Sequence, residues 1–141
     1  MLGIAIAITS EAFKNKSDKS GEPYILHCIR VMLAVKHLGH DAMCVAIMHD
    51  LLEDCPDWTV ERLRELGFNE NIIHDVKALT HTADMSYDDY IKWISYQDIP
   101  RIIKMADLRD NSDITRLKGL TKKDHDRMEK YHRAYTYLKE I

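Results

Sequence analysis

The sequence predicts an all-α fold, a bundle of about seven or eight helices packed as a single domain. Apolar residues recur at spacings of three and four along most of the chain, which is typical of amphipathic helices. No convincing pair of strands with alternating apolar residues is found. The 141 residues include only five glycines and three prolines, and this length suits one domain over residues 1–141.

The first quarter of the chain predicts two helices joined by a loop. Isoleucine alternates with alanine in residues 2–14, as in a strand, but the alanine content favours a helix. Residues 15–22 are rich in lysine, serine and aspartate, which indicates a loop. Pro23 suits the first turn of a helix, so the second helix is predicted from Pro23 to about Leu38, ending at Gly39.

A central helix is expected after His40, with Asp41 as its N-cap. Residues 42–48 are apolar on every face, which places this helix in the middle of the core. The same periodicity and capping signals predict the remaining helices at Thr59–Leu66, Asn69–Leu79, Ser86–Tyr96, Ile99–Asp113 and Thr121 to the C-terminus.

The charge balance and the cysteines exclude several classes of protein. The net charge of −3 provides no general basic field, so no nucleic-acid partner is expected. The early apolar stretch from Leu2 to Ile8 is far shorter than the roughly 20 residues that span a bilayer, and no basic segment precedes it. A cytoplasmic protein without a membrane partner is therefore expected. The three cysteines show no CxxC spacing, which argues against disulfides and a thiolate zinc site.

The segment from Met48 to Asp54 is the most informative part of the sequence. His49 and Glu53 are four residues apart, as are Asp50 and Asp54, so on a helix they would form two stacked pairs on one side. Three carboxylates buried together repel one another and lose their hydration. The segment therefore predicts a bound metal ion.

A divalent ion needs further ligands from neighbouring helices. His27 and Asp107 each lie in a largely apolar helix, where an unpaired polar side chain has no other reason to be. Together with His49 and Asp50 they make a set of two imidazoles and two carboxylates. Such a set suits Mn, Fe, Co, Ni or Zn.

The other polar and aromatic side chains are interpreted as structural. Tyr131 lies at a helical spacing typical of packing residues, and the charges of residues 118–130 alternate as on a solvated helix face. The remaining histidines are taken as structural or solvated: His37, His40, His74, His81, His125 and His132.

The order of these ligands resembles the H…HD…D signature of the HD-domain metal-dependent phosphohydrolases. The finer pattern is similar to the hydrolase domain of the Rel/Spo alarmone enzymes and their single-domain relatives, over roughly residues 10–138. It consists of the segments Gly21–His27, His49–Asp54 and Lys104–Asp107, followed by Asn111.

This resemblance implies an all-α HD-type bundle that hydrolyses the 3′-pyrophosphate of guanosine tetra- and pentaphosphate. It implies Mn²⁺ held by His27, His49, Asp50 and Asp107. The acidic pair, Glu53 and Asp54, is then expected to act on the attacking water. The nucleotide substrate is expected to contact Lys19, Ser20, Tyr24, Lys104 and Asn111.

Asp18 stands where the family enzymes usually carry an arginine that helps to hold the guanine, so the base preference stays open. A phosphohydrolase for nucleoside monophosphates or another small phosphoester is one alternative. A nucleotide-binding sensor without turnover is a second, and a purely structural helical protein is a third. The physiological metal and the oligomeric state also stay open.

Overall fold

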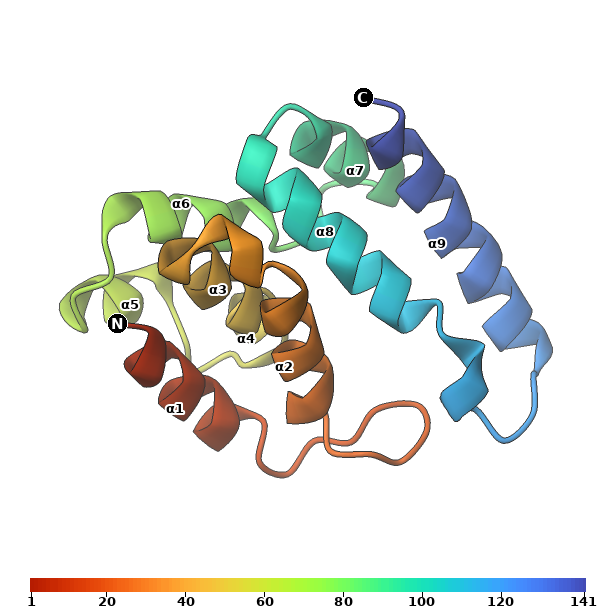
Figure 1. Ribbon diagram of the computed structural model, residues 1–141, viewed down its shortest axis with the longest axis horizontal. Helices are drawn as coiled ribbons and strands as arrows, with labels where there is room; N and C mark the ends of the chain where they lie inside the picture. The colour runs from red at the N-terminus through yellow and green to blue at the C-terminus, as the bar shows by residue number, and fades with distance from the viewer.

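The computed structural model describes residues 1–141 and is all-α, which confirms the predicted fold class (Figure 1). Eight of its α-helices correspond to those expected from the sequence, and a ninth, α4, is a single turn. The elements are α1 (Leu2–Ala12), α2 (Ile25–Ala34), η1 (Lys36–Leu38), α3 (His40–Ile47), α4 (Leu51–Asp54), α5 (Val60–Glu65), α6 (Glu70–Ala78), α7 (Tyr87–Ser95), α8 (Asp98–Asn111), η2 (Ile114–Arg116) and α9 (Lys122–Lys139).

Helix α3 forms the centre of the core, as predicted. Every residue from Ala42 to Met48 is buried, and α3 packs against α1, α2 and α6. Helix α8 lies beside α2 on one side and α9 on the other, so it connects the two halves of the molecule (Figure 1). This arrangement brings α2, the end of α3 and α8 to one place in the interior.

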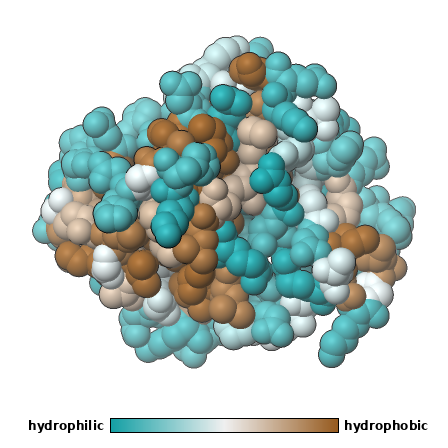
Figure 2. Space-filling model, viewed as in Figure 1, coloured by the Kyte–Doolittle hydropathy of each residue, from teal (hydrophilic) through white to brown (hydrophobic).

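The surface seen in Figure 2 is mostly hydrophilic, with apolar residues gathered along α2. On that helix Leu26 is 38% exposed and Leu33 is 54% exposed. None of the helices combines the length and the apolar composition needed to cross a membrane.

Helix α2 begins at Ile25, two residues later than predicted, because Pro23 closes the preceding loop instead. Pro23 forms an isolated antiparallel bridge with Ser17, and the Tyr24 amide donates to the carbonyl of Lys16 at 2.9 Å. The helix ends at Ala34, and the predicted stretch to Leu38 continues as the 3₁₀ turn η1.

The prediction that Asp41 caps α3 is wrong. The helix already begins at His40, and Gly39 occupies the N-cap position with φ of +96°. Glycine tolerates this left-handed backbone conformation, which redirects the chain sharply into α3. Asp41 lies in the first turn, where its negative charge still interacts favourably with the helix N-terminus.

The capping-box pattern of Ser86 and Asp89 is confirmed only in its N-cap half, whereas that of Thr121 and Asp124 is confirmed in full. The Ser86 hydroxyl accepts a hydrogen bond from the Asp89 amide at the start of α7. Thr121 and Asp124 form a reciprocal capping box at the start of α9.

Candidate metal centre

The structure brings together the four side chains that the sequence singled out. His27 comes from α2, His49 and Asp50 from the turn between α3 and α4, and Asp107 from α8. One potential ligand atom from each residue lies within 4.8 Å of the others. His27, His49 and Asp107 are buried, and Asp50 is partly exposed.

The chain makes a turn at the centre of this cluster, so His49 and Glu53 do not share one helix. Asp50 is the N-cap of α4, and its carbonyl accepts a hydrogen bond from the Asp54 amide at 3.0 Å, so Asp50 and Asp54 still lie one helical turn apart. Helix α3 ends at Ile47 and α4 begins at Leu51. His49 Nε2 lies 3.0 Å from Asp50 Oδ2 and 3.3 Å from Asp107 Oδ1. The expectation that His49 pairs with Glu53 along one continuous helix is therefore wrong.

The end of α3 explains both the turn and the orientation of His49. The His49 Nδ1–H donates to the carbonyl of Ala46 at 2.7 Å, which satisfies a carbonyl of the last helical turn. With its proton on Nδ1, the imidazole presents the lone pair of Nε2 to the two carboxylates. The helix end thus aims a ligand atom into the cluster.

His27 supplies the observation that tests whether an ion fits. Its Nε2 is buried without a hydrogen-bond partner, although it lies 3.0 Å from Asp107 Oδ1 and 3.8 Å from Asp50 Oδ2. A buried polar atom without a partner is costly. A cation between the two carboxylates would satisfy this nitrogen, so the set of two imidazoles and two carboxylates fits a divalent ion.

Neighbouring donors hold the two carboxylates in the charged form. Asp107 accepts hydrogen bonds from Lys104 Nζ at 2.8 Å and Asn111 Nδ2 at 3.0 Å, and Asp50 accepts one from the Tyr24 hydroxyl. Burial acts to raise the pKa of Asp107, but Lys104 and the imidazoles outweigh it and hold that pKa well below its usual range. Both side chains are therefore ready to bind a cation.

The pKa values of the imidazoles predict how stability depends on pH. Burial alone would lower the pKa of His27 and His49, but the nearby carboxylates outweigh it and raise both. Their protonated forms therefore stabilise the metal-free fold fully below the unfolded pKa of about 6.5, and this contribution is lost as pH rises through the higher folded values. We expect the melting temperature in a chelator to fall as the pH is raised above neutral.

This is measured by thermal unfolding across the pH range, with and without Mn²⁺. With the ion bound, the carboxylates are compensated without protonated imidazoles, so the decline above neutral pH should largely disappear. A metal-free melting temperature that stays constant or rises over this range would contradict the assignment.

A cavity of about 230 Å³ borders the cluster and contains the predicted acidic pair. Glu53 Oε1 accepts a hydrogen bond from the His81 amide at 2.7 Å, and Asp54 Oδ2 pairs with Lys16 Nζ at 2.8 Å. Burial, aided by the charges of Asp50 and Asp54, raises the pKa of Glu53. The cavity is lined by Tyr24, Asp50, Glu53, Asp54, His81, Tyr87, Tyr90, Lys104, Asp107, Asn111, Lys130 and Tyr131.

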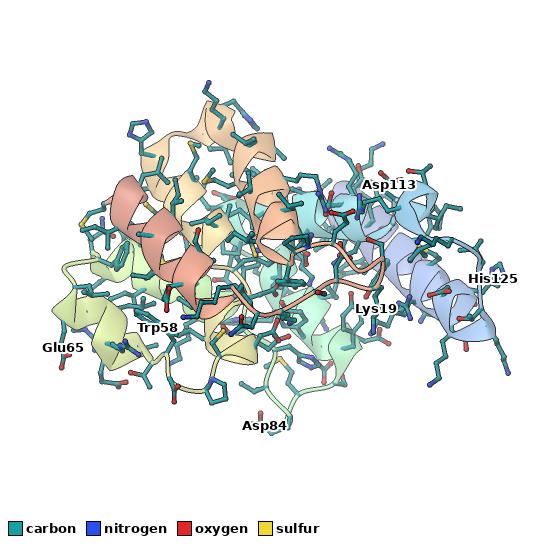
Figure 3. All side chains as sticks on the ribbon, turned by 90° about the horizontal axis from the view of Figure 1, so that it is seen from below. Lys19, Trp58, Glu65, Asp84, Asp113 and His125 are labelled. Atoms are coloured by element: carbon teal, nitrogen blue, oxygen red, sulfur yellow. The ribbon has the colours of Figure 1, made fainter.

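A second cavity of about 440 Å³ contains the predicted loop residues Lys19 and Ser20. Figure 3 shows the loop that carries Lys19 reaching toward the chain near Asp113, which lines the same cavity. The two cavities adjoin, since both are lined by Tyr24, Asn111 and Tyr131. Four cationic side chains line the larger one: Lys16, Lys19, Arg116 and Arg127.

Asp18 has a structural role that the sequence did not reveal. Its Oδ1 accepts hydrogen bonds from the amide and hydroxyl of Ser20, at 2.8 and 2.7 Å, and from the Glu22 amide at 3.0 Å. This pattern, typical of an aspartate that stabilises a turn, fixes the loop beside the larger cavity.

Sequence reasoning missed several residues around the site. Arg127 and Tyr131, interpreted as part of a solvated face and as a packing residue, both line a cavity, and His81 contacts Glu53. The only signal for Arg127 and Tyr131 was their spacing of four on α9.

Asp110 is another residue that sequence reasoning missed, and it contacts His27. Hydrogen bonds from His27 and Arg30 outweigh the effect of burial and lower the pKa of Asp110 to about 2.

Comparisons with known proteins agree with this geometry. A profile of the HD domain family matches residues 5–98. A guanosine-3′,5′-bis(diphosphate) 3′-pyrophosphohydrolase of Aquifex aeolicus is 33% identical over 117 residues, covering 76% of this chain and 16% of that protein. The enzyme of the same name in Haemophilus influenzae is 42% identical over 60 residues, covering 41% of this chain and 9% of that protein.

The bifunctional (p)ppGpp synthase/hydrolase SpoT of Escherichia coli is 28% identical over 87 residues, covering 60% of this chain and 12% of that protein. The chain thus spans less than a fifth of the length of each of these relatives. The resemblance that the motifs indicated is confirmed. Because the profile matches more than half of the chain and includes His27, His49 and Asp50, the chain belongs to the HD domain family.

Proposed function

We propose that this chain is a metal-dependent phosphohydrolase that removes pyrophosphate from the 3′ position of guanosine 3′,5′-bis(diphosphate). The observation that carries this proposal is the meeting of two different cavities at one cluster. One is lined by the candidate ligands Asp50 and Asp107 with Glu53 and Asp54, and the other by the candidate ligand His27 and four cationic side chains. A nucleotide with two separate diphosphates suits this arrangement, and two of the relatives are named for the same reaction.

In this proposal His27, His49, Asp50 and Asp107 hold the ion, with Mn²⁺ as the first metal to test. When bound there, a divalent ion lowers the pKa of a water and neutralises phosphate charge. The ligand set is equally suited to several first-row metals.

Glu53 is proposed to take the proton from the attacking water. Its Oε1 is engaged by the His81 amide, which leaves Oε2 for the proton. Burial raises the pKa of Glu53 above its ordinary value, which makes the carboxylate a stronger base. The water oxygen forms a bond to the phosphorus that is attached to the 3′ oxygen, and the bond between this phosphorus and the 3′ oxygen breaks. The acidic pair of Glu53 and Asp54 then returns the proton to the departing 3′ oxygen. The products are GDP and pyrophosphate.

The nucleotide is proposed to lie across the junction of the two cavities. Tyr24 and Asn111 line both cavities, and Lys104 lines the one at the cluster. Lys19 and Ser20 line the cationic cavity, where they are proposed to contact the nucleotide. In this proposal the reacting phosphate lies at the metal and the rest of the nucleotide lies in the larger cavity.

The test is a panel of nucleotides incubated with the Mn²⁺-loaded protein. We expect pyrophosphate and GDP from guanosine tetraphosphate, with the 5′-diphosphate intact, and no reaction in excess chelator. The products are separated by ion-exchange chromatography, which distinguishes cleavage at the 3′ and 5′ positions.

Two results would contradict the proposal. Release of inorganic phosphate from nucleoside monophosphates, without pyrophosphate from the tetraphosphate, would identify a nucleotidase. Tight binding of the tetraphosphate by metal-loaded protein without any turnover would identify a sensor.

A further inference from the structure

Asp110 lies on α8, three residues after Asp107, and contacts the side of His27 that faces away from the cluster. The two residues are joined by a hydrogen bond between His27 Nδ1 and Asp110 Oδ2 at 2.6 Å. We propose that Asp110 is a positioning residue that keeps the proton of His27 on Nδ1, so that Nε2 presents its lone pair to the metal. This inference rests on the metal site of the proposed function.

The Asp110 carboxylate is itself fixed by two arginines. Arg30 donates from Nε to Oδ1 at 2.7 Å and from Nη2 to Oδ2 at 3.2 Å. Arg116 Nη2 donates to the Asp110 carbonyl at 2.8 Å and lies 3.5 Å from Oδ2. The Asp110 side chain is only 12% exposed, so few waters compete for it.

These contacts determine which nitrogen of His27 carries the proton. Both arginines are permanent donors, so the Asp110 carboxylate between them acts only as an acceptor. Its contact with His27 Nδ1 therefore requires a proton on that nitrogen. The opposite nitrogen, Nε2, is the buried atom without a hydrogen-bond partner.

His49 shows the same arrangement with a different acceptor. Its Nδ1–H donates to the carbonyl of Ala46 at 2.7 Å, and its Nε2 faces the cluster. In both imidazoles, Nδ1 thus donates a hydrogen bond to an acceptor on the side that faces away from the cluster. An acceptor on the outer nitrogen of a histidine ligand fixes its tautomer and raises its basicity, and a carboxylate does so more strongly than a carbonyl.

The first experiment measures metal affinity in Asp110→Asn by competition with a chromophoric chelator, using Zn²⁺ as the probe. The asparagine side chain has the same size, but its amide nitrogen cannot accept a hydrogen bond, so it cannot replace both carboxylate oxygens as acceptors for His27 and Arg30. We expect the affinity to fall about 10–100-fold, the usual cost of losing such a partner. Asp75→Asn is the matched control, because Asp75 also contacts a histidine, His74, at 3.0 Å on α6. The control should keep the affinity of the unchanged protein.

The second experiment needs no substitution. ¹⁵N NMR of the Zn²⁺-loaded protein should show His27 protonated on Nδ1 and bound through Nε2. Binding through Nδ1 would overturn the inference, as would an Asp110→Asn protein that folds and binds Zn²⁺ with unchanged affinity. Neither measurement involves a substrate. A protein that fails to hydrolyse guanosine tetraphosphate would therefore contradict the proposed function while leaving this inference intact.

Discussion

Asp50→Ala should abolish both metal binding and phosphohydrolysis. The change removes one of the two carboxylates of the cluster, leaves the Tyr24 hydroxyl without its acceptor, and takes away the carboxylate oxygen 3.0 Å from His49. Because loss of an outer-shell partner alone costs about 10–100-fold in metal affinity, loss of a charged ligand should cost more than about 100-fold. Elemental analysis after gel filtration measures the bound metal, and the pyrophosphate assay measures the activity.

Asp84→Ala is the matched control for this variant. Figure 3 shows Asp84 at the edge of the molecule, and it lines neither cavity. This control should keep its metal and its activity. The fold of Asp50→Ala in chelator is checked by circular dichroism, because the change also removes the carboxylate that pairs with the His49 imidazole in the metal-free protein. A folded Asp50→Ala protein with full metal content would show that Asp50 is not a ligand.

The features that could be predicted from the sequence are those whose residues carry a signal within their own segment. The buried segment from Ala42 to Met48, the capping box of α9 and the four clustered side chains all carried clear signals. The doublet of His49 and Asp50 after a fully apolar helix is a strong signal, because such a helix end must lie in the core.

The features that sequence could not predict are a side-chain contact that ends a helix and cavities formed between distant segments. The turn after Ile47 is stabilised by His49 and the Ala46 carbonyl, and the sequence read this segment as one helix. Arg116 and Arg127 are near one another and near the loop of residues 15–22 only because η2 and α9 return beside it. A charged residue on a helix is interpreted as solvated until the fold shows a cavity next to it.

Glu53→Gln should lower turnover about 10²–10⁴-fold while leaving metal content and fold intact, the usual range for an acid–base group. The amide oxygen can still accept the hydrogen bond from the His81 amide, so the local geometry is kept and only proton transfer is lost. Asp54→Asn should have a smaller effect, because Asp54 is paired with Lys16 at 2.8 Å. The measurements are kcat for the tetraphosphate and metal content for each variant.

Glu65→Gln, the same change at an exposed position away from both cavities, is the control and should retain full turnover. The pH profile adds a readout that a structural role would not change. If Glu53 is the base, kcat should fall as the pH drops below the pKa of Glu53, which burial raises, since the carboxyl group is then already protonated. In Glu53→Gln this acidic limb should disappear, because the amide does not titrate. If the limb persisted and turnover were unchanged, Glu53 would only orient the loop at His81, and the base would have to be another group lining the cavity.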